Sequence, residues 1–176
     1  MKSLRPIALL ALSAAAAQAY NIEFQFGNTN PKDSPLAGTY GSGTATALAW
    51  SFNATEQISL GLTYGMRKLE HSLPAQTSND VKTLTLDVTY ELSPSQSGIR
   101  PFVGLNLGNS WIDTTAGNQS ALTGKLNAGV RFNVSDSVDL VLGARYGVMW
   151  SVQYAGIATS EDVKGWESFA GIRLKF

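Results

Sequence analysis

The single histidine of this sequence, His71, is followed directly by Ser72, and such a pair could support hydrolysis by a serine nucleophile. The nucleophile would need a base held within hydrogen-bond reach and a third group that orients the base. Adjacent residues in a proline-containing polar segment do not usually adopt that arrangement, and the sequence contains no G-x-S-x-G elbow. We therefore interpret His71 as a solvated loop residue and predict that the protein is not an enzyme.

The composition excludes several other kinds of site. The sequence has no cysteine, which excludes disulfides, thiol nucleophiles and thiolate ligands, and one histidine cannot form a multi-histidine metal site. We predict no metal site and no cofactor. The formal net charge is zero, so no basic field points to a nucleic-acid partner.

Charged side chains are the other set that could do chemistry. Asp87 and Glu91 could be interpreted as an acid–base pair. Both, however, fall in a polar stripe that also carries many cations, and a buried charge is costly unless an opposite charge accompanies it. We therefore expect these carboxylates to act first as structural ion-pair partners.

The elements that carry these residues are eight segments in which apolar and polar residues alternate with a period of two, as in β-strands. In one segment, Leu84, Leu86 and Val88 alternate with Thr85 and Asp87. The segments cover residues 20–26, 45–52, 58–67, 84–91, 103–111, 125–132, 138–152 and 166–176. Four of the eight segments reach the roughly 9–11 residues that a tilted strand needs to cross a bilayer, and the other four have seven or eight residues. In the longest segment, the pattern places Val152 in the apolar set and Ser151 in the polar set.

The connections between these segments alternate in length. Short turns are expected at residues 53–56, 93–98 and 133–136, and longer polar loops at about 28–41, 69–80, 112–120 and 155–164. Short turns at one end, long loops at the other and an even number of strands are typical of outer-membrane barrels, which have no free sheet edge. The predicted fold is all-β, an eight-stranded antiparallel up-and-down transmembrane β-barrel.

A soluble eight-stranded barrel would also alternate, but with its apolar face inward. Three features favour lipid outside. Aromatic residues gather at both ends of the segments, as interfacial girdles do, and the polar set carries charges of both signs among many small residues, as a filled barrel interior would. In addition, Lys68 and Lys82 are the only clear ionic members of the apolar set, and both lie at the loop end. We predict that these two lysines contact lipopolysaccharide phosphates, the alternative being ordinary solvation at the rim.

The polar set of the segments then faces the barrel interior. An eight-stranded barrel has an interior just wide enough for side chains to fill, and small residues leave room for long ones. We predict a structural network of interior charges, which consists of Glu23, Arg67, Asp87, Glu91, Lys125, Arg131, Asp139, Arg145, Glu167, Arg173 and Lys175.

The first nineteen residues are predicted to be a signal peptide. Lys2 and Arg5 precede an apolar run, and Ala17-Gln18-Ala19 fits the small-x-small cleavage pattern. The apolar run is too short for a transmembrane helix; a buried N-terminal helix is the alternative. We assign residues 1–19 to the signal and residues 20–176 to the barrel.

These features resemble the small eight-stranded outer-membrane barrels, the family that includes outer membrane protein X and the barrel domain of outer membrane protein A. The resemblance covers residues 20–176 and includes the final strand. There, Gly171, Ile172, Leu174 and Phe176 are similar to the signal that the barrel-assembly machinery reads, although many members have an aromatic residue where Leu174 stands. No sequence follows Phe176, so we expect no peptidoglycan-binding domain after the barrel.

The resemblance indicates an architecture more than an activity, because one fold supports many functions. We expect an integral protein of the bacterial outer membrane with a structural, surface-interaction or envelope-integrity role. The alternatives are a narrow porin-like channel and, because some similar barrels trim lipid A with a His–Ser pair, a lipid A-modifying enzyme. The expected partners are outer-membrane lipids, lipopolysaccharide, the assembly machinery and an extracellular ligand bound by the loops.

Overall fold

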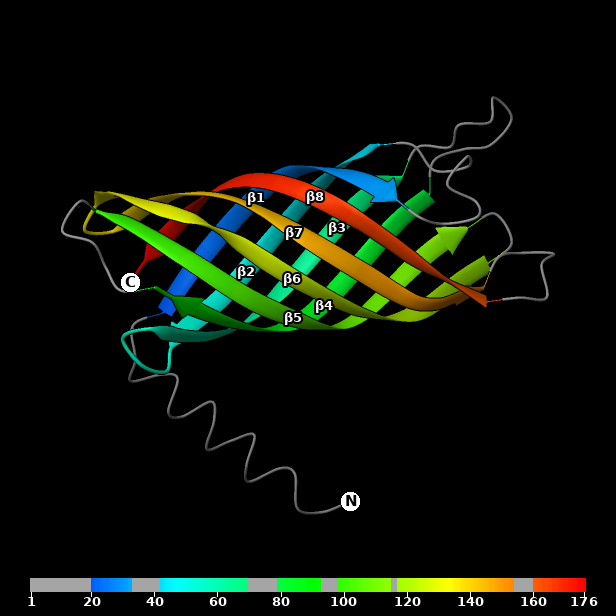
Figure 1. Ribbon diagram of the computed structural model, residues 1–176, viewed down its shortest axis with the longest axis horizontal. Coiled ribbons are helices and arrows are strands. Elements are labelled where there is room, and N and C mark those ends of the chain that lie inside the picture. Colours follow the sequence, from blue (N-terminus) through cyan, green and yellow to red (C-terminus); the bar gives the residue numbers. More distant parts are fainter. Residues whose placement is uncertain (1–19, 33–41, 70–78, 93–97, 115–116, 154–159) are drawn as a thin grey trace, which may run out of the picture.

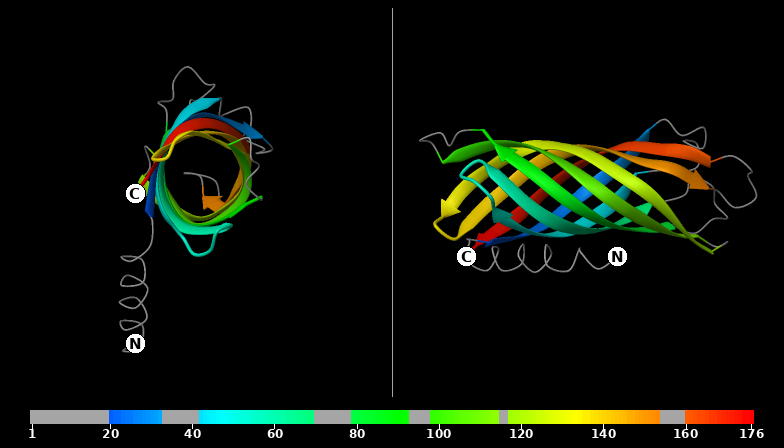
Figure 2. Two further views of the ribbon diagram at one scale, coloured as in Figure 1. Left: turned by 90° about the vertical axis from the view of Figure 1, so that its left-hand side faces the viewer. Right: turned by 90° about the horizontal axis from the view of Figure 1, so that it is seen from below.

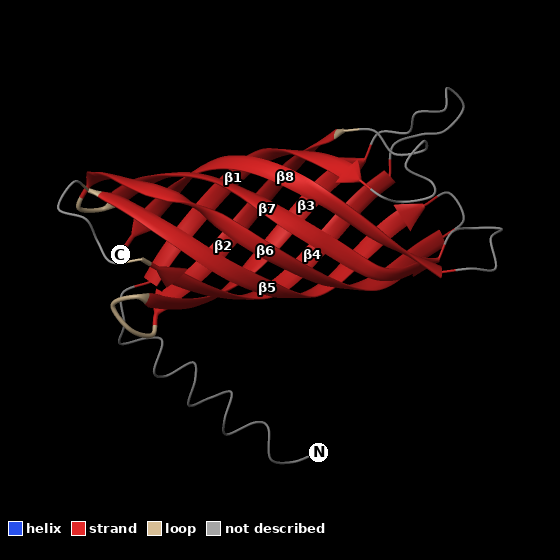
Figure 3. Cartoon of the chain, in the orientation of Figure 1, coloured by secondary structure: helices blue, strands red, loops and turns tan. Residues whose placement is uncertain are grey.

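The computed structural model describes residues 20–32, 42–69, 79–92, 98–114, 117–153 and 160–176, and these form a single barrel of antiparallel strands (Figures 1 and 3). Among these residues, no helix is long and apolar enough to cross a membrane. The strands are β1 (Tyr20–Lys32), β2 (Gly43–Asn53), β3 (Ile58–Leu69), β4 (Asn79–Glu91), β5 (Ile99–Thr114), β6 (Gly117–Ser135), β7 (Val138–Gln153) and β8 (Ser160–Lys175).

Each strand pairs with the next, and β1 pairs with β8 to close the sheet, as the end-on view in Figure 2 shows. A path from paired residue to paired residue, followed once around the barrel, starts at Trp111 on β5 and returns to β5 at Pro101. The strands are therefore staggered by about ten residues, which requires them to tilt relative to the barrel axis. The closure is completed where Phe176 N–H donates to the Tyr20 carbonyl at 3.0 Å. The predicted eight-stranded barrel is confirmed.

The strands are longer than the sequence pattern indicated at the loop end. Residues 112–120 were expected to form a loop, but Ile112 continues β5 and Ala121 lies within β6, so that only residues 115 and 116 fall between the two strands. The prediction failed because both side chains face the barrel interior and are buried there, which favours continued pairing. In the same way β1 extends to Lys32 and β8 begins at Ser160.

The interior of the barrel is its core, and its loop end is apolar. Six buried side chains from five strands contact one another there, namely Val81, Ile112, Ala121, Met149, Val152 and Val163. We call this group the apolar plug. It covers the polar part of the lumen that lies nearer the turns.

The plug depends on a β-bulge in β7 that the sequence pattern did not reveal. The β7–β8 register shifts between Met149 and Val152, and Ser151 has a φ of 55°. A bulge adds one residue and reverses the alternation beyond it. Val152 is therefore buried and Ser151 exposed, the opposite of the predicted placement. The backbone N–H of Ser151 donates to the Asp162 carboxylate at 3.1 Å, which holds the bulge.

Replacement of Ser151 by glycine is expected to raise the free energy of unfolding by about 0.5–1 kcal/mol, because glycine adopts a positive φ without steric cost. Replacement by valine should lower stability, since a β-branched residue is strongly disfavoured at this φ. Urea titration of the folded protein in detergent micelles would measure both variants. Equal stability of the glycine and valine variants would contradict the assigned backbone strain.

Candidate functional site

The turn end of the lumen contains an ionic cluster centred on the Glu91 carboxylate. Glu91 lies at the end of β4 and forms ion pairs with Arg100 at 3.4 Å, with Arg173 at 2.9 Å and with Arg131. Arg131 also lies 3.7 Å from Glu23 on β1. One carboxylate thus joins cations from three other strands across the interior.

A second carboxylate extends this cluster. Asp139 on β7 has no exposed surface and forms ion pairs with Arg100 and, at 2.9 Å, with Lys175. Because Arg100 contacts both Asp139 and Glu91, the two carboxylates belong to a single network. Together with Glu23, the network ties β1, β4, β5, β6, β7 and β8 together at the end of the barrel where the chain turns.

Arg100 was absent from the predicted interior set. The sequence signal was present, since extending the period of two backward from Gly104 places Arg100 on the polar side of β5. Pro101 obscured this signal, because proline is unusual within a strand. Here Pro101 lies one residue beyond the last β4–β5 register pair, Glu91 with Phe102.

Polar groups continue toward the middle of the lumen. Asp87 accepts hydrogen bonds from Thr63, from Asn106 and, at 2.8 Å, from Thr85. Farther around the barrel, Arg145 and Glu167 form an ion pair at 3.3 Å between β7 and β8. Their interior positions make these groups part of the packing of the barrel, with each charge next to an opposite charge or a donor.

Two buried phenylalanines lie in this polar region. The Arg131 guanidinium lies 4.3 Å from the centre of the Phe102 ring, and the Arg145 guanidinium lies 4.2 Å from the Phe169 ring. Such cation–π contacts are stronger where water is excluded. Each ring packs against a glycine, and the two glycines, Gly129 and Gly143, are paired between β6 and β7. A Cβ atom on Gly129 would lie 2.7 Å from the Phe102 Cζ, and a Cβ atom on Gly143 would lie 2.5 Å from the Phe169 Cζ, so the rings occupy space that larger residues would need.

Two of the predicted interior cations are not joined to this network. Lys125 is buried, and the Arg67 Nη2 lies 3.5 Å from the Met149 sulfur at the base of the apolar plug. Within the described part of the chain, neither cation forms a salt bridge with a carboxylate.

The outer surface of the barrel has the opposite character. Large apolar side chains project from every strand and are exposed, with Leu86 68 % and Phe26 66 % accessible. A water-soluble barrel would bury these side chains and expose the charges, whereas a barrel surrounded by hydrocarbon requires the observed arrangement.

The sequence from residue 4 to residue 176 matches the family model described as the outer membrane protein beta-barrel domain. The chain belongs to this family. It is an integral β-barrel of the bacterial outer membrane, which confirms the predicted localisation. Among curated protein sequences, none matches the chain significantly.

Several solved outer-membrane barrels have the same fold. Neisserial surface protein A is 19 % identical, with a TM-score of 0.67, over 90 % of this chain and 99 % of its own. Ail of Yersinia pestis, solved in complex with the heparin analogue sucrose octasulfate, is 13 % identical, with a TM-score of 0.53 over 90 % and 99 %. The outer membrane enzyme PagL is 14 % identical, with a TM-score of 0.51 over 86 % and 97 %. These neighbours share an architecture and differ in what they do.

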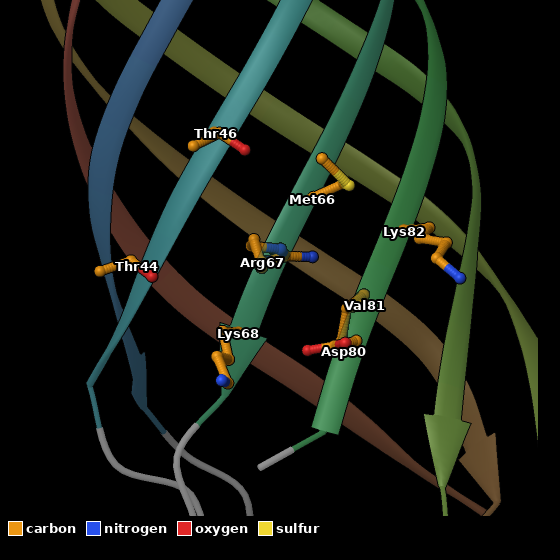
Figure 4. Close-up of a pocket in the computed structure, with 8 residues that line it drawn as sticks. All are labelled: Thr44, Thr46, Met66, Arg67, Lys68, Asp80, Val81 and Lys82. Carbon is orange, nitrogen blue, oxygen red and sulfur yellow. The ribbon is translucent and has the colours of Figure 1, made fainter.

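The two rim lysines of this outer-membrane barrel have different surroundings. The Lys82 ammonium lies 2.9 Å from the Asp113 carboxylate on β5, and Figure 4 shows its side chain turned away from Lys68. Lys68 faces Asp80 in the β3–β4 register without forming a salt bridge with a described carboxylate. The structure therefore does not bring the two ammonium groups together.

The predicted assembly segment consists of the last residues of β8 and of Phe176, which directly follows the strand. Ile172 and Phe176 are exposed on the outer face, while Leu174 is half-buried and Gly171 faces the interior. The Phe176 ring stacks on Tyr20 with 4.9 Å between ring centres. The signal residues, His71 and Ser72 lie outside the described residues.

Proposed function

We propose that this protein is a closed scaffold in the outer membrane, with a structural, surface-interaction or envelope-integrity role and without a pore. The observation that supports the proposal best is the filling of the lumen: an ionic cluster at the turn end, two arginine-covered phenylalanines in the middle and the apolar plug at the loop end. A closed barrel is a scaffold of the kind on which connecting loops carry binding functions.

Purified protein incorporated into planar lipid bilayers is expected to give no conductance above the lipid background. Ions would have to cross a layer of valine, isoleucine and methionine side chains, whose apolar atoms cannot replace the hydration shell of an ion. A large porin in the same bilayers serves as the positive control for the recordings. Reproducible single-channel openings of the wild-type protein would overturn the closed-scaffold proposal.

A narrow water path is the second candidate function. A cavity of about 40 Å³ lies in the lumen beside small residues of β2 and β3, among them Ala49, Ser51, Gly61 and Thr63. This volume admits water rather than a solute. Stopped-flow swelling of proteoliposomes would test the path: water permeability above that of empty liposomes would support it, and equal permeability would remove it.

We propose a non-catalytic role. The alternative is hydrolysis at His71-Ser72 in the manner of a lipid A-modifying enzyme. Mass spectrometry of lipid A from cells with and without the protein distinguishes the two, because a hydrolase would remove a defined acyl chain.

We further propose that residues 1–19 are removed as a signal peptide, that the β8 segment ending at Phe176 engages the barrel-assembly machinery, and that the loops bind an extracellular ligand. Outer-membrane lipids and lipopolysaccharide are the proposed partners of the barrel wall, with Lys68 and Lys82 at the level of their phosphates.

A further inference from the structure

The outer face of β1–β4 carries two adjoining grooves. One groove, of about 170 Å³, lies nearest the loop end, which is at the bottom of Figure 4; we call it the upper groove, because the longer loops of such barrels are extracellular. Its outward-facing lining residues are Thr44, Thr46, Met66, Lys68, Asp80 and Lys82. The lower groove, of about 190 Å³, is lined by Phe24, Gln25, Phe26, Thr46, Ala47, Leu48, Tyr64 and Met66. Thr46 and Met66 line both, so the two grooves meet at this pair of residues.

The lower groove is shaped by a short side chain among long ones. In the strand register, Thr46 stands between Phe26 on β1 and Met66 on β3, and the next outward positions toward the turns are Leu48 and Tyr64. The threonine leaves a trough bordered by apolar side chains, on a surface that faces hydrocarbon. A linear acyl chain is the occupant that such a trough fits.

The upper groove has the chemistry of a headgroup site. Figure 4 shows the hydroxyl oxygens of Thr44 and Thr46 on the side of β2 that faces β3, where Lys68 lies at the strand end. Hydroxyl and ammonium groups both donate hydrogen bonds to phosphate oxygens. Lys82 lines the same groove, but its ammonium lies 2.9 Å from Asp113, so its charge is already balanced.

We propose that this composite groove binds one phosphorylated acyl lipid of the outer leaflet, with its phosphate at Lys68 and Thr44 and an acyl chain along Thr46 between Phe26 and Met66. The inference deepens the proposed lipid contact of the barrel wall and rests on it. Of the two rim lysines, only Lys68 is assigned to binding of the phosphate. The trough at Thr46 is added as the part of the site that accommodates the acyl chain.

Asp80 provides a test of opposite sign. Its carboxylate also lines the upper groove and faces Lys68 across the β3–β4 register, so it opposes a phosphate there. Neutralising Asp80 should strengthen binding at the same site that neutralising Lys68 weakens.

The experiment measures retention of bisphosphorylated lipid A by the full-length mature barrel in detergent micelles, using native mass spectrometry over a lipid titration. Lys68→Gln is expected to weaken binding about fivefold, because one cation near a lipid headgroup contributes about that factor. Lys164→Gln on β8 carries the same charge change outside both grooves and should leave binding within about twofold. Asp80→Asn should strengthen binding by a few-fold.

The steric element is tested by Thr46→Leu, which fills the trough and should weaken binding severalfold. Ala128→Leu on β6 adds apolar volume to the outer face outside both grooves and should change nothing. Phosphatidylcholine should be retained more weakly than lipid A, and excess inorganic phosphate should not displace bound lipid A.

Equal effects of Lys68→Gln and Lys164→Gln, unchanged binding in Thr46→Leu, or full displacement by inorganic phosphate would each overturn the lipid site. The bilayer recordings test the closed scaffold independently, because a barrel without this site would still be closed. Gel mobility with and without heating shows that each variant is folded, so that lost binding is not mistaken for lost structure.

Discussion

Replacement of Glu91 by glutamine is expected to lower the free energy of unfolding by about 3–5 kcal/mol, a large part of the stability of a single domain. The Glu91 carboxylate contacts Arg100, Arg131 and Arg173, so its neutralisation leaves three guanidinium groups close together without their shared anion. Urea titration of the barrel folded into phosphatidylcholine vesicles would measure the loss. Tryptophan fluorescence can report unfolding, since the four tryptophans lie on the outer, lipid-facing surface.

The matched control is Glu56→Gln, the same chemical change at an exposed position in the turn between β2 and β3. Surface substitutions of this kind usually alter stability by less than about 0.5 kcal/mol. Glu91→Asp should fall between the two, because it keeps the charge but shortens the reach to the arginines. If Glu91→Gln unfolded at the same urea concentration as Glu56→Gln, the cluster would not be the structural core that its contacts indicate.

The period of two was sufficient to predict most of the fold, because it fixes which face each residue occupies once a strand is continuous. Leu86, for example, is 68 % exposed between the inward-facing Thr85 and Asp87, as the alternation requires. The same alternation places the charged residues of the polar set in the interior, where the structure pairs most of them.

The bulge at Ser151 could not be predicted from the local pattern. A positive φ is usually marked by glycine or asparagine, and β7 has serine at this position. The group that holds the bulge, Asp162, comes from a different strand. Since the stabilising contact is non-local, the sequence around Ser151 gave no sign that Val152 turns inward.

The two interior phenylalanines show a further limit of pattern reasoning. Phe102 and Phe169 occupy inward positions of their strands, but an apolar residue in a polar stripe has no obvious partner in the sequence. Their partners are Gly129 and Gly143, which face one another across the β6–β7 register. This pairing places two residues without side chains next to each other, which leaves space on the inner face of the sheet. The rings of Phe102 and Phe169, from the strands on either side, fill that space.

Replacement of Phe169 by alanine should lower the free energy of unfolding by about 3–5 kcal/mol, the usual cost of removing a buried phenyl ring from a packed core. The ring is 5 % exposed and lies beneath the Arg145 guanidinium. Its removal would therefore leave a cavity next to this guanidinium and would also remove the cation–π contact. Phe169→Leu keeps most of the volume and loses the ring face, and it should cost about 1–2 kcal/mol. Urea titration in the same vesicles would compare the two variants.

Gly143→Ala shows whether the ring and the glycine are fitted to one another. In the wild-type background the new methyl group would lie 2.5 Å from the Phe169 Cζ and 2.9 Å from the Ala128 carbonyl oxygen, so it should be destabilising. In the Phe169→Ala background the ring contacts are gone while the carbonyl contact remains, and the same substitution should cost less. Contacting residues give such non-additive effects, whereas independent ones add. Additive losses would mean that the ring does not fill the space above Gly143, and that something other than this pairing sets the packing of the middle of the lumen.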